Sequence, residues 1–147
     1  MEIIRATVEQ AEVVAPLFDL YRQFYKAASD LEGSARFLRE RLERNESVIF
    51  LAMDAESAVG FVQMYPVFAS VQLKRLWILN DLYVLGSERK RGIGEGLMKR
   101  AEEYARETGT RGLFLRTATD NLAAQRLYEA CGWVRDTKFY RYDLIVE

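Results

Sequence analysis

A loop rich in glycine and basic residues has the composition of a phosphate site. It reads GSERKRGIGEG over residues 86–96, and the residues after it have helical spacing. The first turn of a helix has backbone N–H groups without partners, and the helix dipole favours negative charge there. Gly92 and Gly94 allow the backbone to approach an anion closely, and the basic run at 89–91 adds positive charge. We therefore expect phosphate groups to bind at this helix start.

Two common phosphate motifs do not fit this loop. A P-loop requires Gly-Lys-Ser/Thr, and no glycine in the chain is followed by lysine. A dinucleotide site needs a third glycine where the chain has Leu97, and LFLRT, about 20 residues on, lacks the expected acidic ribose ligand. The pattern R-x-x-G-x-G does fit, through Arg89, Gly92 and Gly94, and it is typical of a site for the pyrophosphate of coenzyme A. A basic, solvated turn before an ordinary amphipathic helix is the alternative.

Composition limits the other functions. The chain has 147 residues, which suits a single domain (1–147), and its net charge of -1 gives no overall field that favours nucleic acid or a membrane surface. Histidine is absent, which excludes Ser-His-Asp triads and His-containing zinc sites, and we expect no metal. No apolar run approaches a membrane span of about 20 residues, and MEIIRATVEQ does not resemble a secretory signal. These features predict a cytoplasmic protein.

Hydrophobic periodicity predicts an α+β fold with two helices before the main run of strands. Thr7 and Gln10 have capping-box spacing, and Ser34 is expected to cap the second helix. The tail WVRDTKFYRYDLIVE is expected to form one or two closing strands. The other expected elements are a strand over MEIIRA, helices over 7–25 and 34–45, strands over 47–53, 58–67 and 75–85, a helix over 93–108, a strand over 111–117 and a helix over 121–131.

A second motif lies downstream, in the segment NLAAQRLYEACGW. It has the pattern Asn-x-x-Ala-x-x-x-Tyr, filled by Asn121, Ala124 and Tyr128, and a Gly-Trp turn follows. The R-x-x-G-x-G motif precedes it, and the GNAT superfamily of N-acetyltransferases has these two motifs in this order. The chain therefore resembles that superfamily. The resemblance implies the GNAT fold, with a mixed and mostly antiparallel central sheet flanked by helices. In that fold two central strands splay apart, and acetyl-CoA lies in the gap.

The resemblance also implies which residues hold acetyl-CoA, the acetyl donor. In the family, backbone groups of a bulged strand pair with the pantetheine arm, and the loop amides hold the pyrophosphate. Lys90 or Arg91 is implied as a partner of the 3'-phosphate, and Asn121 matches a cofactor-binding asparagine, although it equally suits a helix N-cap. The implied set is Leu82, Tyr83, Val84, Arg89, Lys90, Arg91, Gly92, Ile93, Gly94, Glu95, Asn121 and Ala124.

Acetyl transfer to an amine requires a proton acceptor for the amine and a proton donor for the departing thiolate. Tyr128 matches the family's general acid, because a tyrosine with a pKa of about 10 can protonate a thiolate whose acid has a pKa of about 8.5. Its helix face, shared with Leu127 and Cys131, also suits a core position. Asn80 stands where related enzymes have a glutamate base, and its amide can only orient a water.

The proton acceptor is therefore open. Asp81 would face the other side of an ideal strand from Asn80, so it serves only if a bulge brings it round. A water relay and an amine that arrives neutral are the other routes. Asp81 equally suits a buried polar contact to the backbone.

The resemblance implies a cytoplasmic, acetyl-CoA-dependent N-acetyltransferase that acts by direct transfer to the primary amine of a small molecule. Acceptor specificity in the family comes from the first two helices and their loop, here 21–34, where Tyr21, Phe24 and Tyr25 either line an acceptor slot or belong to the core. The alternatives are a non-catalytic acyl-CoA-binding module and an acetyltransferase of protein or peptide amines. A homodimer is common in the family, although no segment here identifies an interface.

Overall fold

Five strands form one mixed sheet, in the order β1-β2-β3-β4-β5. The computed structural model describes residues 1–147, which divide into two compact units, Met1–Arg116 and Thr117–Glu147. The first unit contains the whole sheet, and only its last pair, β4 with β5, is parallel. The strands are β1 (Glu2–Ala6), β2 (Val48–Asp54), β3 (Ser57–Ala69), β4 (Lys74–Val84) and β5 (Leu113–Phe114). The predicted mixed and mostly antiparallel sheet is therefore confirmed.

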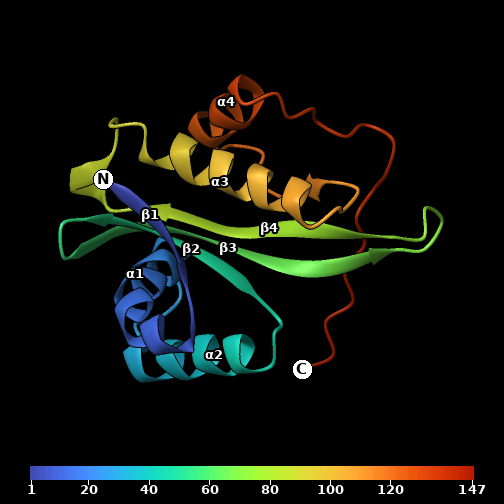
Figure 1. The fold of residues 1–147 in the computed structure, drawn as a ribbon. Coiled ribbons are helices and arrows are strands. Elements are labelled where there is room, and N and C mark those ends of the chain that lie inside the picture. Colours follow the sequence, from blue (N-terminus) through green and yellow to red (C-terminus); the bar gives the residue numbers. More distant parts are fainter. The chain divides into compact units, whose positions relative to one another are not determined.

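Helices cover both faces of this sheet. α1 (Ala11–Phe24) and α2 (Leu31–Glu43) lie on one face, and α3 (Ile93–Glu107) lies on the other (Figure 1). Short 3-10 turns, η1 (Val8–Gln10) and η2 (Gly86–Glu88), precede α1 and α3, and α4 (Leu122–Ala130) belongs to the second unit. None of the helices combines the length and the apolar content that crossing a membrane requires.

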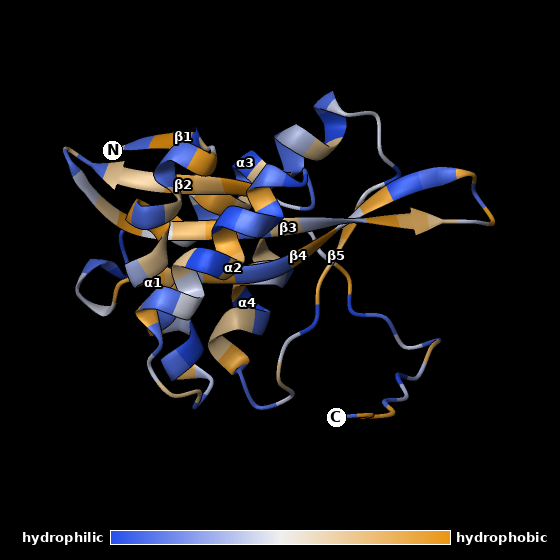
Figure 2. Ribbon diagram, turned by 90° about the horizontal axis from the view of Figure 1, so that it is seen from below, coloured by the Kyte–Doolittle hydropathy of each residue, from blue (hydrophilic) through white to orange (hydrophobic).

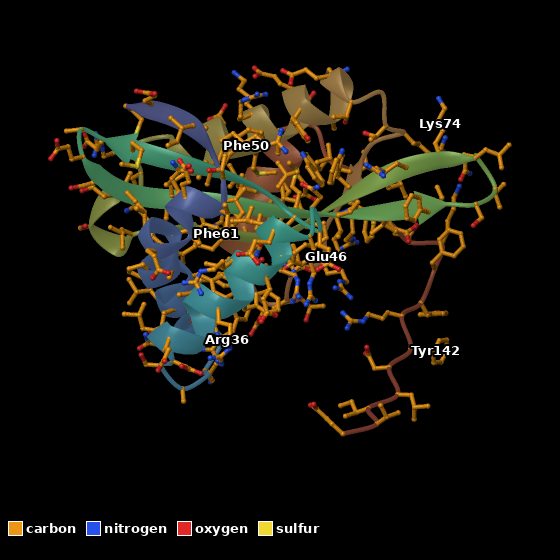
Figure 3. The ribbon with its side chains drawn as sticks, turned by 60° about the horizontal axis from the view of Figure 1, so that its bottom comes forward. Arg36, Glu46, Phe50, Phe61, Lys74 and Tyr142 are labelled. Atoms are coloured by element: carbon orange, nitrogen blue, oxygen red, sulfur yellow. The ribbon has the colours of Figure 1, made fainter.

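Two phenylalanines show how the core forms on both faces. Phe50 on β2 makes an edge contact with Tyr104 of α3, their ring centroids 5.5 Å apart, and Phe61 on β3 makes one with Phe18 of α1 at 6.1 Å. Both phenylalanines are completely buried, and Figure 3 shows them on neighbouring strands in the middle of the sheet. Apolar residues are concentrated along β2 and β3 (Figure 2). A sheet buried on both faces explains why these strands lack a simple apolar-polar alternation.

The helix starts follow from their caps. The Gln10 side-chain oxygen accepts a hydrogen bond from the Thr7 amide at 2.7 Å, which confirms the predicted capping box. The second helix begins earlier than predicted, because Asp30 and not Ser34 is its N-cap. The Asp30 carboxylate accepts from the Gly33 amide at 2.8 Å, and Ser34 lies buried in the first turn. The chain offers two good capping side chains here, and sequence alone could not rank them.

Two strand predictions were wrong, one in its extent and one altogether. The strand expected over 111–117 is reduced to Leu113–Phe114, which pairs with Trp77 and Ile78. The tail expected to close the sheet has no strand, and side chains such as Phe139, Tyr142 and Val146 are exposed. Figure 3 labels Tyr142 on this tail. Aromatic and β-branched composition measures how well a segment suits a sheet. It does not supply the neighbouring strand whose backbone groups make the ladder.

Asp19 ties the loop between α1 and α2 to the body of α1. Its buried carboxylate accepts hydrogen bonds from the Ser29 hydroxyl at 2.6 Å, the Asp30 amide at 2.7 Å and the Gln23 amide at 3.1 Å. The Arg22 guanidinium lies 3.4 Å from the same carboxylate. The Ser29 hydroxyl and the Asp30 amide hold the pKa of Asp19 below its ordinary value. Asp19 therefore works as a charged anchor for residues 25–30.

We expect Asp19→Asn to lower the free energy of unfolding at pH 7 by roughly 1–3 kcal/mol, because an amide cannot accept all of these hydrogen bonds. The pKa of Asp19 is lower in the folded chain than in the unfolded one. Its contribution is therefore complete above a pH of about 4 and disappears as the pH falls through the folded pKa. Urea unfolding at pH 7 and pH 3 measures this. The control Glu102→Ala removes only an exposed ion pair with Arg106, and an equal loss in both variants would contradict the anchoring role.

Candidate active site

Asn80 is an extra residue in β4. Gln63 of β3 pairs with Asp81, and the next residue, Met64, pairs with Leu79, so Asn80 has no partner in the ladder. This is a β-bulge. In a regular strand Asn80 and Asp81 would point to opposite faces. Here the Asn80 side-chain amide donates to the Asp81 carboxylate at 3.0 Å, so the bulge brings the two predicted residues together.

The bulge also decides which helix layer Asp81 faces. Trp77, four residues earlier, packs against Tyr104 of α3, and in a regular strand Asp81 would point the same way. Instead Asp81 lies two residues before Tyr83, whose ring contacts Tyr21 of α1, so Asp81 shares that face. The extra residue has changed the parity of the strand, so Asp81 lies on the α1 side of the sheet.

Neutral groups surround the Asp81 carboxylate. The side chain is buried, and the Gln63 amide donates to it at 2.7 Å. The Tyr21 hydroxyl also donates to the backbone carbonyl of Asn80 at 3.3 Å. Burial raises the pKa of Asp81, while hydrogen bonds from Gln63, Tyr21 and Asn80 oppose that rise. A buried carboxylate without a cationic partner binds a proton more readily than a solvent-exposed carboxylate does.

Sequence reasoning missed the residues that support this carboxylate. Gln63 is completely buried, and its carbonyl oxygen has no hydrogen-bond partner. The pKa of Tyr65 is raised by burial and by the nearby charge of Asp81. The signal that was available is the single polar residue in the middle of the apolar run VGFVQMYPV. A polar side chain at such a position needs a buried partner.

After the bulge, β4 is open along one edge. Residues 82–84 pair with β3 through Val62, Phe61 and Gly60, whereas the ladder with β5 ends at Ile78. No strand occupies the other side of Leu82, Tyr83 and Val84, which are half-buried. Their backbone groups on that edge are free of ladder pairing, as the family's pairing with a pantetheine arm requires.

The glycine loop leads into a helix start with no side-chain cap. Gly92 is the N-cap of α3, has φ 76°, and offers no side chain to the first-turn amides of Ile93, Gly94 and Glu95. Arg89 donates to the Val84 carbonyl at 3.0 Å, so it fastens the loop to the end of β4. This arrangement leaves amides available for an anion.

The two candidate phosphate partners differ in their surroundings. Arg91 forms ion pairs with Glu88 and with Asp54, the latter at 3.3 Å. Lys90 is exposed and has φ 66°, a left-handed conformation that is rare outside glycine. Of the two, Lys90 is not engaged by these carboxylates.

Gly60 allows α3 to begin close to the sheet. It pairs with Val84, and a Cβ atom at this position would lie 3.0 Å from the Tyr83 carbonyl oxygen and 3.3 Å from a methyl group of Ile93. Both contacts are tighter than ordinary packing allows. Gly60 is therefore a second glycine that sets the position of the loop, and sequence reasoning overlooked it because it lies in a strand, far from the motif.

In the second unit, α4 carries the downstream motif. The Asn121 carboxamide oxygen accepts from the Ala124 amide at 3.3 Å, so Asn121 is a helix N-cap, and its predicted contact with the cofactor stays a prediction. Tyr128 is half-buried, and its ring lies 6.3 Å from that of Trp133 between centroids. Its role as general acid also stays a prediction. The chain contains no cluster of three or more side chains able to hold a metal ion.

Comparison with known proteins identifies the family. Residues 14–133 match the model of the acetyltransferase (GNAT) family, and the chain belongs to this family. It is an N-acetyltransferase, as the motifs predicted.

Individual relatives are similar over almost the whole chain. The chain is 45% identical over 146 residues to the uncharacterized N-acetyltransferase YhfO of Bacillus subtilis (strain 168). The matched region covers 99% of this chain and 98% of that protein. The crystal structure of a probable acetyltransferase matches with a TM-score of 0.94 at 43% identity, over 100% of this chain and 99% of that one. The aminoglycoside N-acetyltransferase AAC(6')-Iy, in complex with CoA, shares the fold with a TM-score of 0.81 at 19% identity, over 97% and 93% of the two chains.

We expect Asp81→Asn to raise the free energy of unfolding at pH 8 by roughly 1 kcal/mol, because it removes a buried charge and Gln63 can turn its unpaired oxygen toward the new amide. The pKa of Asp81 is higher in the folded chain than in the unfolded one, so wild-type stability is lost as the pH rises through the folded pKa. The gain should therefore shrink at pH 4.

Urea unfolding at pH 4 and pH 8 tests this prediction. Asp19→Asn is the matched control, because the same substitution at a carboxylate with a lowered pKa must lose stability at high pH. A loss of stability in Asp81→Asn at pH 8 would contradict this prediction and would show that the Asp81 carboxylate stabilises the fold.

Proposed function

We propose that this N-acetyltransferase uses acetyl-CoA as donor and transfers the acetyl group directly to the primary amine of a small molecule. The observation that carries the proposal is the continuity of residues 80–95. This one segment contains a buried carboxylate, an unpaired strand edge and an uncapped helix start, in that order. These are a proton acceptor, a surface for an extended arm and an anion site.

The donor is held by backbone groups. The amides at the start of α3 suit the pyrophosphate, and the open edge of Leu82, Tyr83 and Val84 suits the pantetheine arm. Lys90 is the better partner for the 3'-phosphate, because Arg91 is already paired with two carboxylates. Bound acetyl-CoA supplies a thioester carbonyl that an amine can attack.

The transfer forms one bond and breaks another. The amine nitrogen bonds to the carbonyl carbon, the carbon–sulfur bond breaks, and the amine loses a proton while the thiolate gains one. Asp81 accepts the amine's proton, directly or through a water that Asn80 orients, and its raised pKa makes it a better base than an exposed aspartate. Tyr128 gives its proton to the thiolate.

We expect Gly92→Ala to weaken CoA binding by at least about tenfold, because alanine disfavours φ 76° and displaces the first-turn amides. Gly109→Ala is the matched control. It places the same change at φ 64° just past the other end of α3, and an added Cβ has open space at both positions. Each variant should lose roughly 1 kcal/mol of stability, but only Gly92→Ala should raise the Kd for CoA in calorimetry. Equal Kd values for CoA in the two variants would contradict pyrophosphate binding at the start of α3.

Incubation with acetyl-CoA and a panel of small amines, amino acids and short peptides should release free thiol. We expect Tyr128→Phe to lower kcat by about 100-fold or more while the Kd for CoA is unchanged, because only a proton donor is lost. Tyr140→Phe is the control, since that side chain is exposed in the tail. CoA binding without thiol release from any amine would favour a non-catalytic acyl-CoA-binding module. Peptides outperforming small amines would favour a peptide acetyltransferase.

A further inference from the structure

A row of aromatic rings runs from the exposed end of α1 to β4. Phe24 and Tyr25 are 57% and 55% exposed, and their ring centroids lie 5.3 Å apart. Tyr25 contacts the half-buried Tyr21 at 5.1 Å, and Tyr21 lies 6.4 Å from Tyr83. We call Phe24, Tyr25 and Tyr21 the aromatic row. It begins in solvent and ends beside the strand proposed to hold the donor.

The inner end of the aromatic row is at the bulge. The Tyr21 hydroxyl donates to the Asn80 carbonyl at 3.3 Å, and Asn80 in turn donates its side-chain amide to the Asp81 carboxylate at 3.0 Å. A molecule lying along the row therefore has its inner end beside the proposed proton acceptor.

Two carboxylates near this end of α1 already have hydrogen-bond partners. Asp19 accepts hydrogen bonds from the loop and pairs with Arg22, and Asp30 caps α2 through the Gly33 amide. Exposed Lys26, next to Tyr25 in the chain, adds positive charge here. Asp81 is the carboxylate at the inner end of the aromatic row.

These features distinguish between classes of amine. A polyamine or an aminoglycoside carries several positive charges, whereas the aromatic row offers apolar rings, Lys26 adds positive charge beside it, and Asp81 is the single carboxylate at its inner end. An amine with one charge and an aromatic or long apolar body meets complementary surfaces. Its body packs on exposed rings, and its single ammonium group is attracted by ring faces and by Asp81.

We propose that the acceptor is a monoamine with an aromatic or long apolar body, which packs on the aromatic row while its amine approaches Asp81. The inference rests on the proposed function and adds the acceptor class to it. The chemistry is unchanged: the amine nitrogen forms the amide, its proton passes to Asp81, and the thiol leaves.

The experiment compares acceptors in the thiol-release assay with the full chain. 2-Phenylethylamine and hexylamine carry apolar bodies, whereas ethanolamine and spermidine do not. We expect kcat/KM for the two apolar amines to exceed that for ethanolamine and spermidine by at least about tenfold. Burial of the apolar area of a phenyl group supplies enough free energy for a preference of this size. A preference for spermidine or ethanolamine, with thiol release intact, would overturn the inference and leave the proposed function standing.

Variants locate the effect. Phe24→Ala, at an exposed position, should raise KM for 2-phenylethylamine about tenfold and lower kcat/KM for ethanolamine much less, because only the apolar body contacts this ring. Phe68→Ala, at a residue of β3 that is 73% exposed, is the control and should change neither substrate. An equal effect of Phe24→Ala on both amines would overturn the inference. Absence of thiol release with every amine would overturn the proposed function and the inference together.

Discussion

The extra residue in β4 is the constraint on which the candidate site depends. Asn80 is inserted opposite the step from Gln63 to Met64, and every residue after it points to the face opposite the one it would otherwise have. Asp81 consequently leaves the side of α3 for that of α1, and Tyr83 meets Tyr21. A change of one residue in register thus decides whether the carboxylate faces α1 or α3.

Two aspartates show how the same side chain serves opposite purposes. Asp19 is surrounded by donors and pairs with Arg22, so its charge is stabilised and it fastens a loop. Asp81 is buried among neutral groups, so its charge is costly and its affinity for a proton is raised. The buried charge of Asp81 is therefore an energetic disadvantage to the fold, which our proposal explains by a role in proton transfer.

Local patterns predicted much of the fold. The helices have apolar stripes, and the capping box at Thr7 precedes α1. The glycine loop lies at the start of α3, as its motif predicted. The bulge was beyond such reasoning, because a period of two in an apolar strand does not show where one residue is added. Gln63 and Gly60 were missed for a related reason, since their importance comes from Asp81 and Val84, their partners in the neighbouring strand β4, which lie about 20 residues away in the sequence.

The closing strands that were predicted and are absent show a second limit of prediction from local sequence. Residues 133–147 have the composition of strands and adopt none, because strand formation requires a partner as well as propensity. Asn121 shows a third limit of such prediction. Its cap role could be anticipated from its position before an amphipathic helix, but the same side chain suits a cofactor contact, and residue type alone does not separate the two.

The placement of α1 and α3 on opposite faces of one sheet has a consequence for how such a protein can change over time (Figure 1). On our proposals, the parts that handle the donor and the parts that choose the acceptor share only β4. Exposed positions near the end of α1 and the start of α2, such as Leu20, Phe24 and Leu31, can vary with little effect on core packing. Selection or engineering can therefore redirect the enzyme to new amines through α1 while the donor side is conserved.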